Sequence, residues 1–322
     1  MDQKKIKQLQ AGDTVQSFFL VKAANSKTGS NNKSFLDLTL VDQTGELNAK
    51  IWDSNDADVE QYVPNTLVKV RGSVNEWQSR LQLKIDKIRV TTVEDDLDIG
   101  EFVPVAPYSP EFMYAEIESY IDKISNQDMH AIVRSLITAH KEKFLLYPAA
   151  KQNHHAVRSG LMYHIMTMLR MGEKASEIYI GLNRDLLFSG IILHDIAKIA
   201  EMNASELGIV SEYTIEGELL GHIIQGIKMI DQTATKVGAD LEVSLLLQHM
   251  ILSHHNEPAF GSPKRPMIPE AEMLHHLDML DARMFDMQRV LGNVEDGKLS
   301  EKVWLLDNRK LYKTAVKNED NE

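Results

Sequence analysis

The stretch Ile191-Ile192-Leu193-His194-Asp195-Ile196-Ala197-Lys198 places a histidine and an aspartate at the end of an apolar run. Ser189 and Gly190 precede it in a segment that would otherwise be plain core. Burying a charged group is costly unless the group is paired or binds a metal. These two side chains therefore need partners, and we expect the rest of the fold to supply them.

The length and composition indicate a soluble protein of two domains. The chain has 322 residues, of which 43% are hydrophobic, enough for each domain to bury its own core. It has no apolar run of about eighteen residues and begins with the polar stretch Met1-Asp2-Gln3-Lys4-Lys5, which predicts a cytoplasmic location and no membrane partner. Cysteine is absent, so disulfides and thiolate metal sites are excluded, and any metal must be held by nitrogen and oxygen.

The charge is unevenly distributed along the chain. The formal net charge of −12 by itself argues against nucleic-acid binding, because phosphate contacts depend on lysine and arginine. However, residues 1–95 carry equal numbers of basic and acidic side chains, and the later residues carry the whole excess. The first part of the chain therefore remains a candidate for binding a nucleic acid, whereas all twelve histidines lie in the second part.

Alternating apolar and polar residues predict five strands in the first part of the chain. A short helix, Ser54–Tyr62, is expected after the third strand, and residues 25–32 are expected to form a loop. Five short strands with this helix match an OB-fold barrel, which we assign to residues 1–93 as a nucleic-acid-binding domain. The predicted strands are Thr14–Ala23, Lys33–Leu40, Leu47–Trp52, Leu67–Glu76 and Arg80–Val90.

The same alternation separates the outward face of the barrel from its core face. Leu36, Leu38 and Leu40 share the core face, and aromatic and basic residues take the other. Such a face suits single-stranded nucleic acid, because bases stack on rings and cations meet the backbone. The alternative is that the two aromatic residues only cap the barrel end. The candidate nucleic-acid-binding residues of the barrel are Phe35, Lys50, Trp52, Arg71 and Lys84.

An acidic stretch with three prolines, residues 94–110, is interpreted as a linker. In residues 111–312 the apolar positions recur at helical spacing without a competing strand pattern or repeat, which predicts an all-α bundle. Residues 313–322 form a charged tail, of which we expect Asn318–Glu322 to be disordered. The expected helices include Ser159–Met171, Asp185–Ala200, Glu216–Val237, Leu241–Ser253 and Glu270–Gln288.

Ionisable residues stand at wide intervals within these helices. A bundle can direct one or two of them from each helix to a shared centre, as bundle metal sites do. A lone histidine on an apolar face is more often a hydrogen-bonded core residue, the role assigned to His130, His140, His249, His275 and His276. His154 and His155 lie just before the first ligand helix, where they could contact substrate or support a ligand. The candidate ligands are His164, His194, Asp195, His222, His254, His255 and Asp278.

Imidazole and carboxylate donors favour manganese, iron, cobalt, nickel or zinc over magnesium. The candidates exceed what one ion needs, and two ions bridged by a carboxylate suit the hydrolysis of a phosphoester. Lys198 follows Asp195 by three residues, so its ammonium is expected on the same side, where it could hold a phosphate. The alternative is a solvated lysine at an exposed helix end. Asp195 and Lys198 are thus the candidate catalytic residues.

The ordered set of a histidine, a His-Asp doublet, further histidines and a final aspartate resembles the HD superfamily of metal-dependent phosphohydrolases. The resemblance implies that His164, His194, Asp195 and Asp278 hold one metal. It implies that Asp195, His222 and either His254 or His255 hold the other.

The order of the domains carries a second resemblance. An OB-fold ahead of an HD domain, with Tyr147-Pro148-Ala149-Ala150 and Gly261-Ser262-Pro263-Lys264, is similar to the YhaM-type 3'-5' exoribonucleases of Gram-positive bacteria. Their longer histidine run is replaced here by Asn153-His154-His155. The resemblance implies manganese-dependent removal of nucleotides from the 3' end of RNA, with the OB-fold guiding the strand.

Several questions remain open at this point. Lys264 and Arg265 could receive backbone phosphates, or they belong to a plain surface loop flanked by prolines. The enzyme could act on small nucleotides or cyclic dinucleotides, or the chain could be a regulatory nucleic-acid-binding protein with a structural metal site. The expected partner is single-stranded RNA, with single-stranded DNA as the alternative, and a homo-oligomer is left open.

Overall fold

The computed structural model describes residues 4–29, 32–78, 80–151 and 155–316. The chain divides into two compact units, Met1–Val105 and Ala106–Glu322, which are described separately. Most of the predicted tail, from residue 317 on, lies outside the described residues. The domain limits given above stay a prediction.

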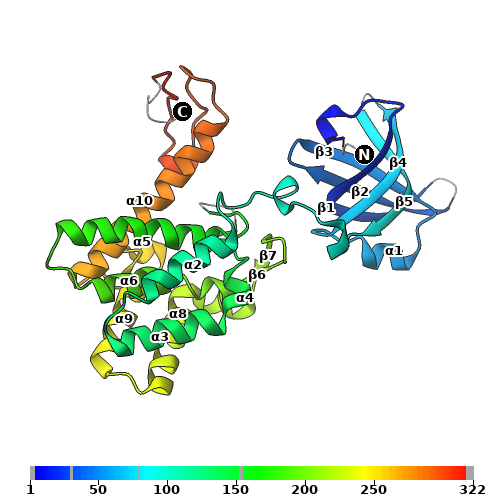
Figure 1. Cartoon of the computed structure of the whole chain (residues 1–322). Coiled ribbons are helices and arrows are strands. Elements are labelled where there is room, and N and C mark those ends of the chain that lie inside the picture. Colours follow the sequence, from blue (N-terminus) through cyan, green and yellow to red (C-terminus); the bar gives the residue numbers. More distant parts are fainter. Residues whose placement is uncertain (1–3, 30–31, 79, 152–154, 317–322) are drawn as a thin grey trace. The chain divides into compact units, whose positions relative to one another are not determined.

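The first unit is a closed five-stranded barrel, as the alternation predicts (Figure 1). Neighbouring strands are antiparallel except for β3 and β5, which are parallel, and the strand order is β1-β2-β3-β5-β4. Short 3-10 turns at Ile6–Gln8, Val93–Asp95 and Ile99–Glu101 flank the barrel. The elements are β1 (Thr14–Thr28), β2 (Ser34–Asp42), β3 (Gly45–Trp52), α1 (Asp56–Gln61), β4 (Leu67–Trp77) and β5 (Arg80–Val90).

The barrel core contains the residues that the alternation assigns to it. Leu36, Leu38 and Leu40 of β2 are fully buried together with Phe19 and Leu83, whereas Phe35 is only partly buried. The prediction was wrong about residues 25–28, because β1 continues through them and pairs with β2 up to Thr28↔Ser34. Cross-strand hydrogen bonds thus override the turn preference of this polar stretch.

The second unit is predominantly helical, as predicted (Figure 1). Side chains of Ser109, Asn126, Asn183 and Thr214 accept a backbone N–H hydrogen bond where α2, α3, α6 and α8 begin. None of the helices in the described part of the chain is long and apolar enough to span a bilayer. The helices are α2 (Pro110–Ile121), α3 (Gln127–Ala139), α4 (Lys141–Phe144), α5 (Gly160–Ile178), α6 (Arg184–Leu193), α7 (Lys198–Glu201), α8 (Ile215–Val237), α9 (Leu241–Ser253) and α10 (Pro269–Gly292).

Helix α6 is the centre of this unit. All residues from Leu186 to Leu193 are buried, and the helix packs against α2, α3, α5, α9 and α10. A helix that is surrounded in this way is apolar on every side, which explains why its sequence shows no polar face. The 3-10 turns Pro258–Phe260 and Trp304–Leu306 complete the unit.

Three local features differ from the predictions for this unit. The helix expected over Asp185–Ala200 is interrupted, because residues 194–197 form a turn between α6 and α7. A small antiparallel pair, β6 (Met202–Ala204) and β7 (Val210–Tyr213), lies between two expected helices of a domain that was predicted to be all-α. Helix α8 is broken at Gly221, whose φ of 69° favours glycine, so a second helical segment begins at His222.

Candidate functional site

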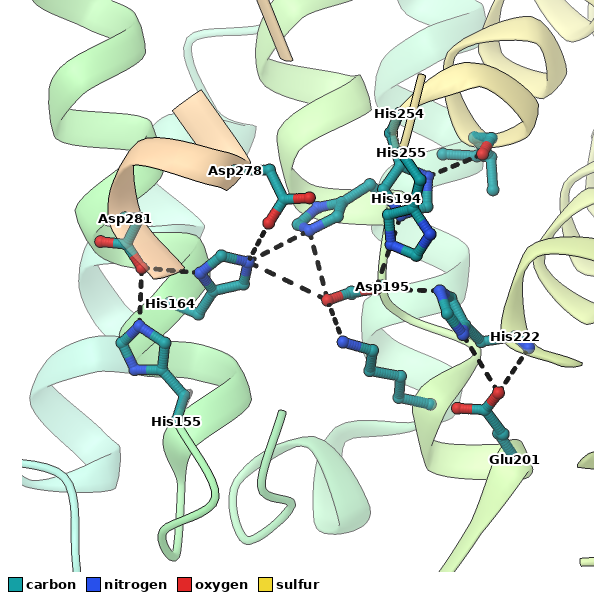
Figure 2. A network of polar contacts seen from close by, with 12 residues as sticks. His155, His164, His194, Asp195, Glu201, His222, His254, His255, Asp278 and Asp281 are labelled. Atoms are coloured by element: carbon teal, nitrogen blue, oxygen red, sulfur yellow. Dashed lines mark hydrogen bonds and ion pairs between the residues drawn. The ribbon is translucent and has the colours of Figure 1, made fainter. Parts of the chain in front are cut away.

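The His194-Asp195 doublet lies at the centre of the helical unit. The pair occupies the turn directly after α6, with exposed fractions of 0% and 2%. The other candidate ligands come from α5, the break in α8, the end of α9 and the middle of α10 (Figure 2). The structure therefore brings all seven together, although their role as ligands stays a prediction.

One group of atoms surrounds Oδ2 of Asp195. The Nε2 atom of His194 lies 3.3 Å from it and that of His164 lies 3.9 Å away. The two Nε2 atoms are 3.2 Å apart, and Oδ1 of Asp278 lies 3.3 Å from Nε2 of His164. Lys198 Nζ contacts the same Asp195 oxygen at 2.6 Å. Three candidate ligands, His164, His194 and Asp278, thus lie together on the Oδ2 side of Asp195.

A second group faces the other oxygen of the same carboxylate. Nε2 of His222 lies 3.5 Å from Asp195 Oδ1, and Nε2 of His254 lies 3.9 Å from it. His255 completes this group, since it offers a ring nitrogen within 4.8 Å of those of His222 and His254. Both histidines of the His254-His255 pair therefore stand beside the site. The geometry does not favour one of these two histidines over the other as a ligand of the second group.

The histidine rings are held in one tautomer by backbone carbonyls. Nδ1 of His194 donates to Ile191 O at 2.8 Å, and Nδ1 of His254 donates to Ile251 O at 2.7 Å. Nδ1 of His255 is held in the same way by a carbonyl, at 2.6 Å. A carbonyl only accepts, so the proton of the neutral ring is on Nδ1, and Nε2 presents its lone pair to the site.

Two carboxylates hold the remaining histidines. Oδ2 of Asp281 lies 2.7 Å from Nδ1 of His164, and Oε1 of Glu201 lies 3.1 Å from Nδ1 of His222. Glu201 also accepts the backbone N–H of His222 at 2.9 Å, where the second segment of α8 begins. Such outer carboxylates orient metal-binding imidazoles and raise their basicity. Neither carboxylate was predicted as a partner of these histidines. The available signal was their spacing, three residues after Asp278 and three after Lys198.

Three buried atoms at the centre have no hydrogen-bond partner among the residues that the structure describes. They are Oδ1 of Asp195, Nε2 of His222 and Nε2 of His254. Leaving one buried polar group unsatisfied costs about 1–3 kcal/mol. A cation bound between them would satisfy all three, and a nitrogen and oxygen donor set suits a divalent transition metal. The residues present therefore fit the divalent cation expected for this site.

The pKa shifts are consistent with such a site. Burial and the neighbouring His255 lower the pKa of His254 well below its ordinary value, and burial and His222 lower that of His255, so both rings are neutral at pH 7. Burial alone would raise the pKa of Asp195, but Lys198 and His194 bring it well below its usual range.

His164 differs from the other rings. Burial opposes its charged form, yet hydrogen bonds to Asp278 and Asp281 raise its pKa to about 10. A proton therefore lies between His164 and the carboxylates when no cation is bound, and a cation entering there must displace it.

A pocket of about 610 Å³ opens beside the centre. Asp195, Lys198, His222 and Asp278 line its polar side. Its other walls are mostly apolar, with Met202, Tyr213, Phe260 and Met279 among them. A volume of this size is typical of small-molecule sites. A ligand in it would therefore touch the candidate metal ligands directly.

The structure decides between several alternatives for single residues. Lys198 is 9% exposed, so the interpretation as a solvated lysine was wrong. His155 is buried with Nε2 2.6 Å from Asp281 Oδ2, which makes it a support of the His164–Asp281 pair, and burial lowers its pKa to about 4. His154 lies outside the described residues.

Of the other positions considered in the helical unit, His275 lies beside the pocket, whereas Lys264 and Arg265 do not line it. His275 lines the pocket, with Nδ1 2.8 Å from His254 O, although it was assigned to the core. Lys264 and Arg265 are exposed, and neither is among the described residues that line the pocket. Arg265 lies 3.3 Å from Glu257, which does line it.

On the barrel, Phe35 and Trp52 pair across β2 and β3 with ring centroids 4.9 Å apart. Nζ of Lys50 lies 5.0 Å from one ring centroid and 5.2 Å from the other. Trp52 is 47% exposed, so this cluster is open to solvent. Lys84 of β5 is the register partner of Lys50, whereas Arg71 lies on β4, between β1 and β5. Arg71 is thus separated from the aromatic pair by strand β5.

Two family models match the chain, one within each compact unit. One family model, the OB-fold nucleic acid binding domain, matches residues 21–91, and a second, the HD domain, matches residues 161–283. Among solved structures, the second OB-fold domain of replication protein A from Methanococcus maripaludis is 22% identical, covers 27% of this chain and 92% of its own, and has a TM-score of 0.23.

A second solved structure, a mitochondrial single-stranded DNA binding protein from S. cerevisiae, is 14% identical. It covers 26% of this chain and 98% of its own, with a TM-score of 0.22. The family matches, the barrel and the buried histidine and aspartate clusters together lead to one conclusion. The chain carries an OB-fold domain of the nucleic-acid-binding type followed by an HD domain, a metal-dependent phosphohydrolase module.

Proposed function

We propose that the protein is a manganese-dependent 3'-5' exoribonuclease, in which the OB-fold domain binds single-stranded RNA and the HD domain hydrolyses the terminal phosphodiester. The observation that carries the proposal is the position of Asp195. Its Oδ2 faces His164 and His194, and its Oδ1 faces His222 and His254. A carboxylate shared by two groups of imidazoles is suited to hold two cations side by side.

The charge of the pocket supports a role for cations in substrate binding. Lys198 is the one cationic side chain among the described residues that line it, and it is already paired with Asp195. The lining carboxylates Glu201, Glu257 and Asp278 would repel a phosphate. Divalent cations bound to the predicted ligands would neutralise the phosphodiester and activate water for attack at phosphorus.

Lys198 is proposed to have two roles. Its Nζ, 2.6 Å from Asp195 Oδ2, keeps that carboxylate ionised and holds it in one orientation. It also lines the pocket, where an entering phosphate would meet it. Asp281 and Glu201 orient His164 and His222 through their Nδ1 atoms, so the Nε2 atoms remain directed at the centre.

The barrel and the pocket walls both fit an unpaired strand. Phe35 and Trp52 offer rings for stacking, and Lys50 beside them offers a cation for the backbone. In the pocket, Tyr213 and Phe260 provide apolar contact for a base without selecting among bases. These features favour a substrate that is single-stranded and read without strong sequence preference.

The test uses RNA labelled at its 5' end and incubated with the full chain and manganese. We expect progressive shortening from the 3' end, and Asp195→Asn should reduce it to background while Asp296→Asn, an exposed aspartate, leaves it unchanged. A 3'-terminal phosphate or other block should slow the wild type. Degradation that persists in the Asp195 variant, or internal cleavage, would refute the proposal.

A second candidate is a phosphohydrolase of small nucleotides or cyclic dinucleotides. It is favoured by the pocket, which is large enough for a nucleotide and whose described lining residues belong to the helical unit. Comparing turnover of an oligonucleotide with that of mononucleotides and a cyclic dinucleotide separates the two. Faster turnover of the small substrates would favour this candidate, whereas binding without any cleavage in manganese would favour a regulatory protein with a structural metal site.

A further inference from the structure

The cations of the barrel fall into two classes. Many are neutralised by a carboxylate within 4 Å: Lys4, Lys5, Lys22, Lys27, Lys33, Lys69 and Arg89. Others have no carboxylate at that distance in the described part of the barrel: Lys7, Lys50, Arg71, Arg80, Lys84 and Lys87. Apart from Lys7, the members of the second class all lie on β3, β4 and β5. These three strands are adjacent in the barrel.

Strand pairing places four of these cations in a continuous row. Lys50 of β3 is the register partner of Lys84 of β5. Further along β5, Lys87 is the register partner of Arg71 of β4. Lys84, Lys87 and Arg71 are exposed, and Lys50 is half-buried against the rings of Phe35 and Trp52. We call Lys50, Lys84, Lys87 and Arg71 the cationic row.

An irregularity in β5 is what creates this row. In a regular strand, residues three apart point to opposite faces. Here the register shifts between Arg71 and Gly72, so that Asp86 is the extra residue of a β-bulge and both Lys84 and Lys87 face outward. Gly72 permits the close approach of the strands, because a Cβ there would lie 2.1 Å from the carbonyl oxygen of Lys84. The bulge therefore extends the basic surface from β3 onto β4.

The far end of the row lies at a groove. This groove of about 290 Å³ is lined by Gln16, Lys69, Arg71, Lys87 and Arg89, together with Val70 and Ile88. Lys69 and Arg89 share Asp95, so Arg71 and Lys87 carry most of the unbalanced positive charge. Asp86 is the one acidic residue beside them on β5. The groove thus has the chemistry to accept phosphate groups.

We propose that a single nucleic-acid strand stacked on Phe35 and Trp52 continues across β5 onto β4, where Arg71 and Lys87 bind its phosphates. The aromatic pair and the groove are two parts of one binding track, joined by Lys50 and Lys84. Adjacent strands are about 4.8 Å apart, so the row extends the platform by two strand widths. The proposal rests on single-strand binding by the OB-fold domain, which is part of the proposed function.

The test measures binding of fluorescent oligouridylates of four and of twelve nucleotides to the full chain, with a chelator present to prevent cleavage. The double variant Arg71→Gln/Lys87→Gln should bind the short probe as the wild type does. Its affinity for the long probe should fall severalfold. Loss of two phosphate contacts should also lower the slope of log affinity against log salt by about 1.4 for the long probe.

The matched control is Lys7→Gln/Lys22→Gln, which removes the same charge from exposed positions outside the row. It should behave as the wild type with both probes, and all variants should show unchanged thermal midpoints. An unchanged affinity of the Arg71/Lys87 variant for the long probe would overturn the track while leaving single-strand binding intact. Equal losses in the control would overturn it as well. A wild type that binds neither probe would refute the proposed function itself.

Discussion

Lys50 in the barrel and Lys198 in the helical unit both stand beside proposed functional side chains, but in opposite environments. Lys50 lies over two rings on an open face and has no carboxylate within 4 Å among the described residues. Lys198 is buried, with Asp195 at 2.6 Å. Water screens the first charge, whereas the second is held in a medium where an unpaired charge is costly. We therefore expect substitutions of the barrel's cations to change the affinity for nucleic acid, and substitutions of the buried charges to change the stability of the helical unit.

The largest expected difference between the two lysines is in stability. Lys198→Met leaves the buried Asp195 without its cation and should lower the free energy of unfolding by about 3–5 kcal/mol. Lys50→Met should change it by less than about 0.5 kcal/mol. Urea unfolding with a chelator present, followed by far-UV circular dichroism, measures both. Equal small losses in the two variants would show that Asp195 is not held in a dry environment.

A second pair of variants tests separately the two groups of candidate ligands on either side of the Asp195 carboxylate. Asp281→Asn should weaken cation binding about 10–100-fold, because it removes the carboxylate that orients His164. Glu201→Gln should do the same through His222. Calorimetric titration with manganese measures both losses of cation affinity. Each variant should still bind one cation more tightly than the other, at the group of ligands that the substitution leaves intact. Glu272→Gln, an exposed change on α10, is the control. A loss no greater than in that control would contradict the proposed supporting roles.

On the barrel, loss of the exposed Trp52 ring should lower the affinity for an oligonucleotide without changing the rate of hydrolysis. Trp52→Ala should cost about 1–3 kcal/mol in the binding of an oligonucleotide, the range for one stacked base. Trp77→Ala, which removes a ring that is 65% exposed at the end of β4, should have no such effect. Hydrolysis of a small phosphodiester should be unchanged in both. Equal affinities of the two variants would mean that Phe35 and Trp52 only close the barrel end.

The smallest expected effect is on the pH dependence of the free energy of unfolding. Burial lowers the pKa of His155 to about 4, so below about 6.5 the unfolded chain takes up a proton at this residue that the folded chain does not. Stability is therefore lost as the pH falls from about 6.5 towards 4, by about 1 kcal/mol at pH 5.5. His155→Gln should flatten the dependence of unfolding free energy on pH in this window. An unchanged slope would mean that His155 is not neutral in the folded protein.

Much of the fold could be predicted because the deciding signals are local. A period of two residues places Leu36 in the barrel core and Phe35 outside it. The surrounded helix α6 is recognisable from its long apolar run, which only Ser189 and Gly190 interrupt. The continuation of β1 through Asn25 was not predictable, because residues 25–28 are polar and show no alternation of apolar and polar positions, although they pair with β2. The break at Gly221 was equally hidden, because apolar periodicity continues on both sides of it.

The candidate site was predictable only in part. Residue type and spacing were sufficient to select the inner histidines, Asp195 and Asp278. The groups that hold the Nδ1 atoms of these histidines are mostly backbone carbonyls, such as that of Ile191. Every residue has a backbone carbonyl, so the sequence does not show which of them take part. Asp281 and Glu201 resemble ordinary helix-surface acids, and their role appears only when α10 and α7 are packed against their histidines.

The spread of the site along the chain has a consequence for folding. The segments that meet at Asp195 run from His164 to Asp278, and no two of the inner histidines other than His254 and His255 are neighbours in sequence. Local helices can form early, but the centre closes only after these long-range contacts are made. Cation binding therefore stabilises only the fully assembled helical unit, because a partly folded chain does not yet have the binding site.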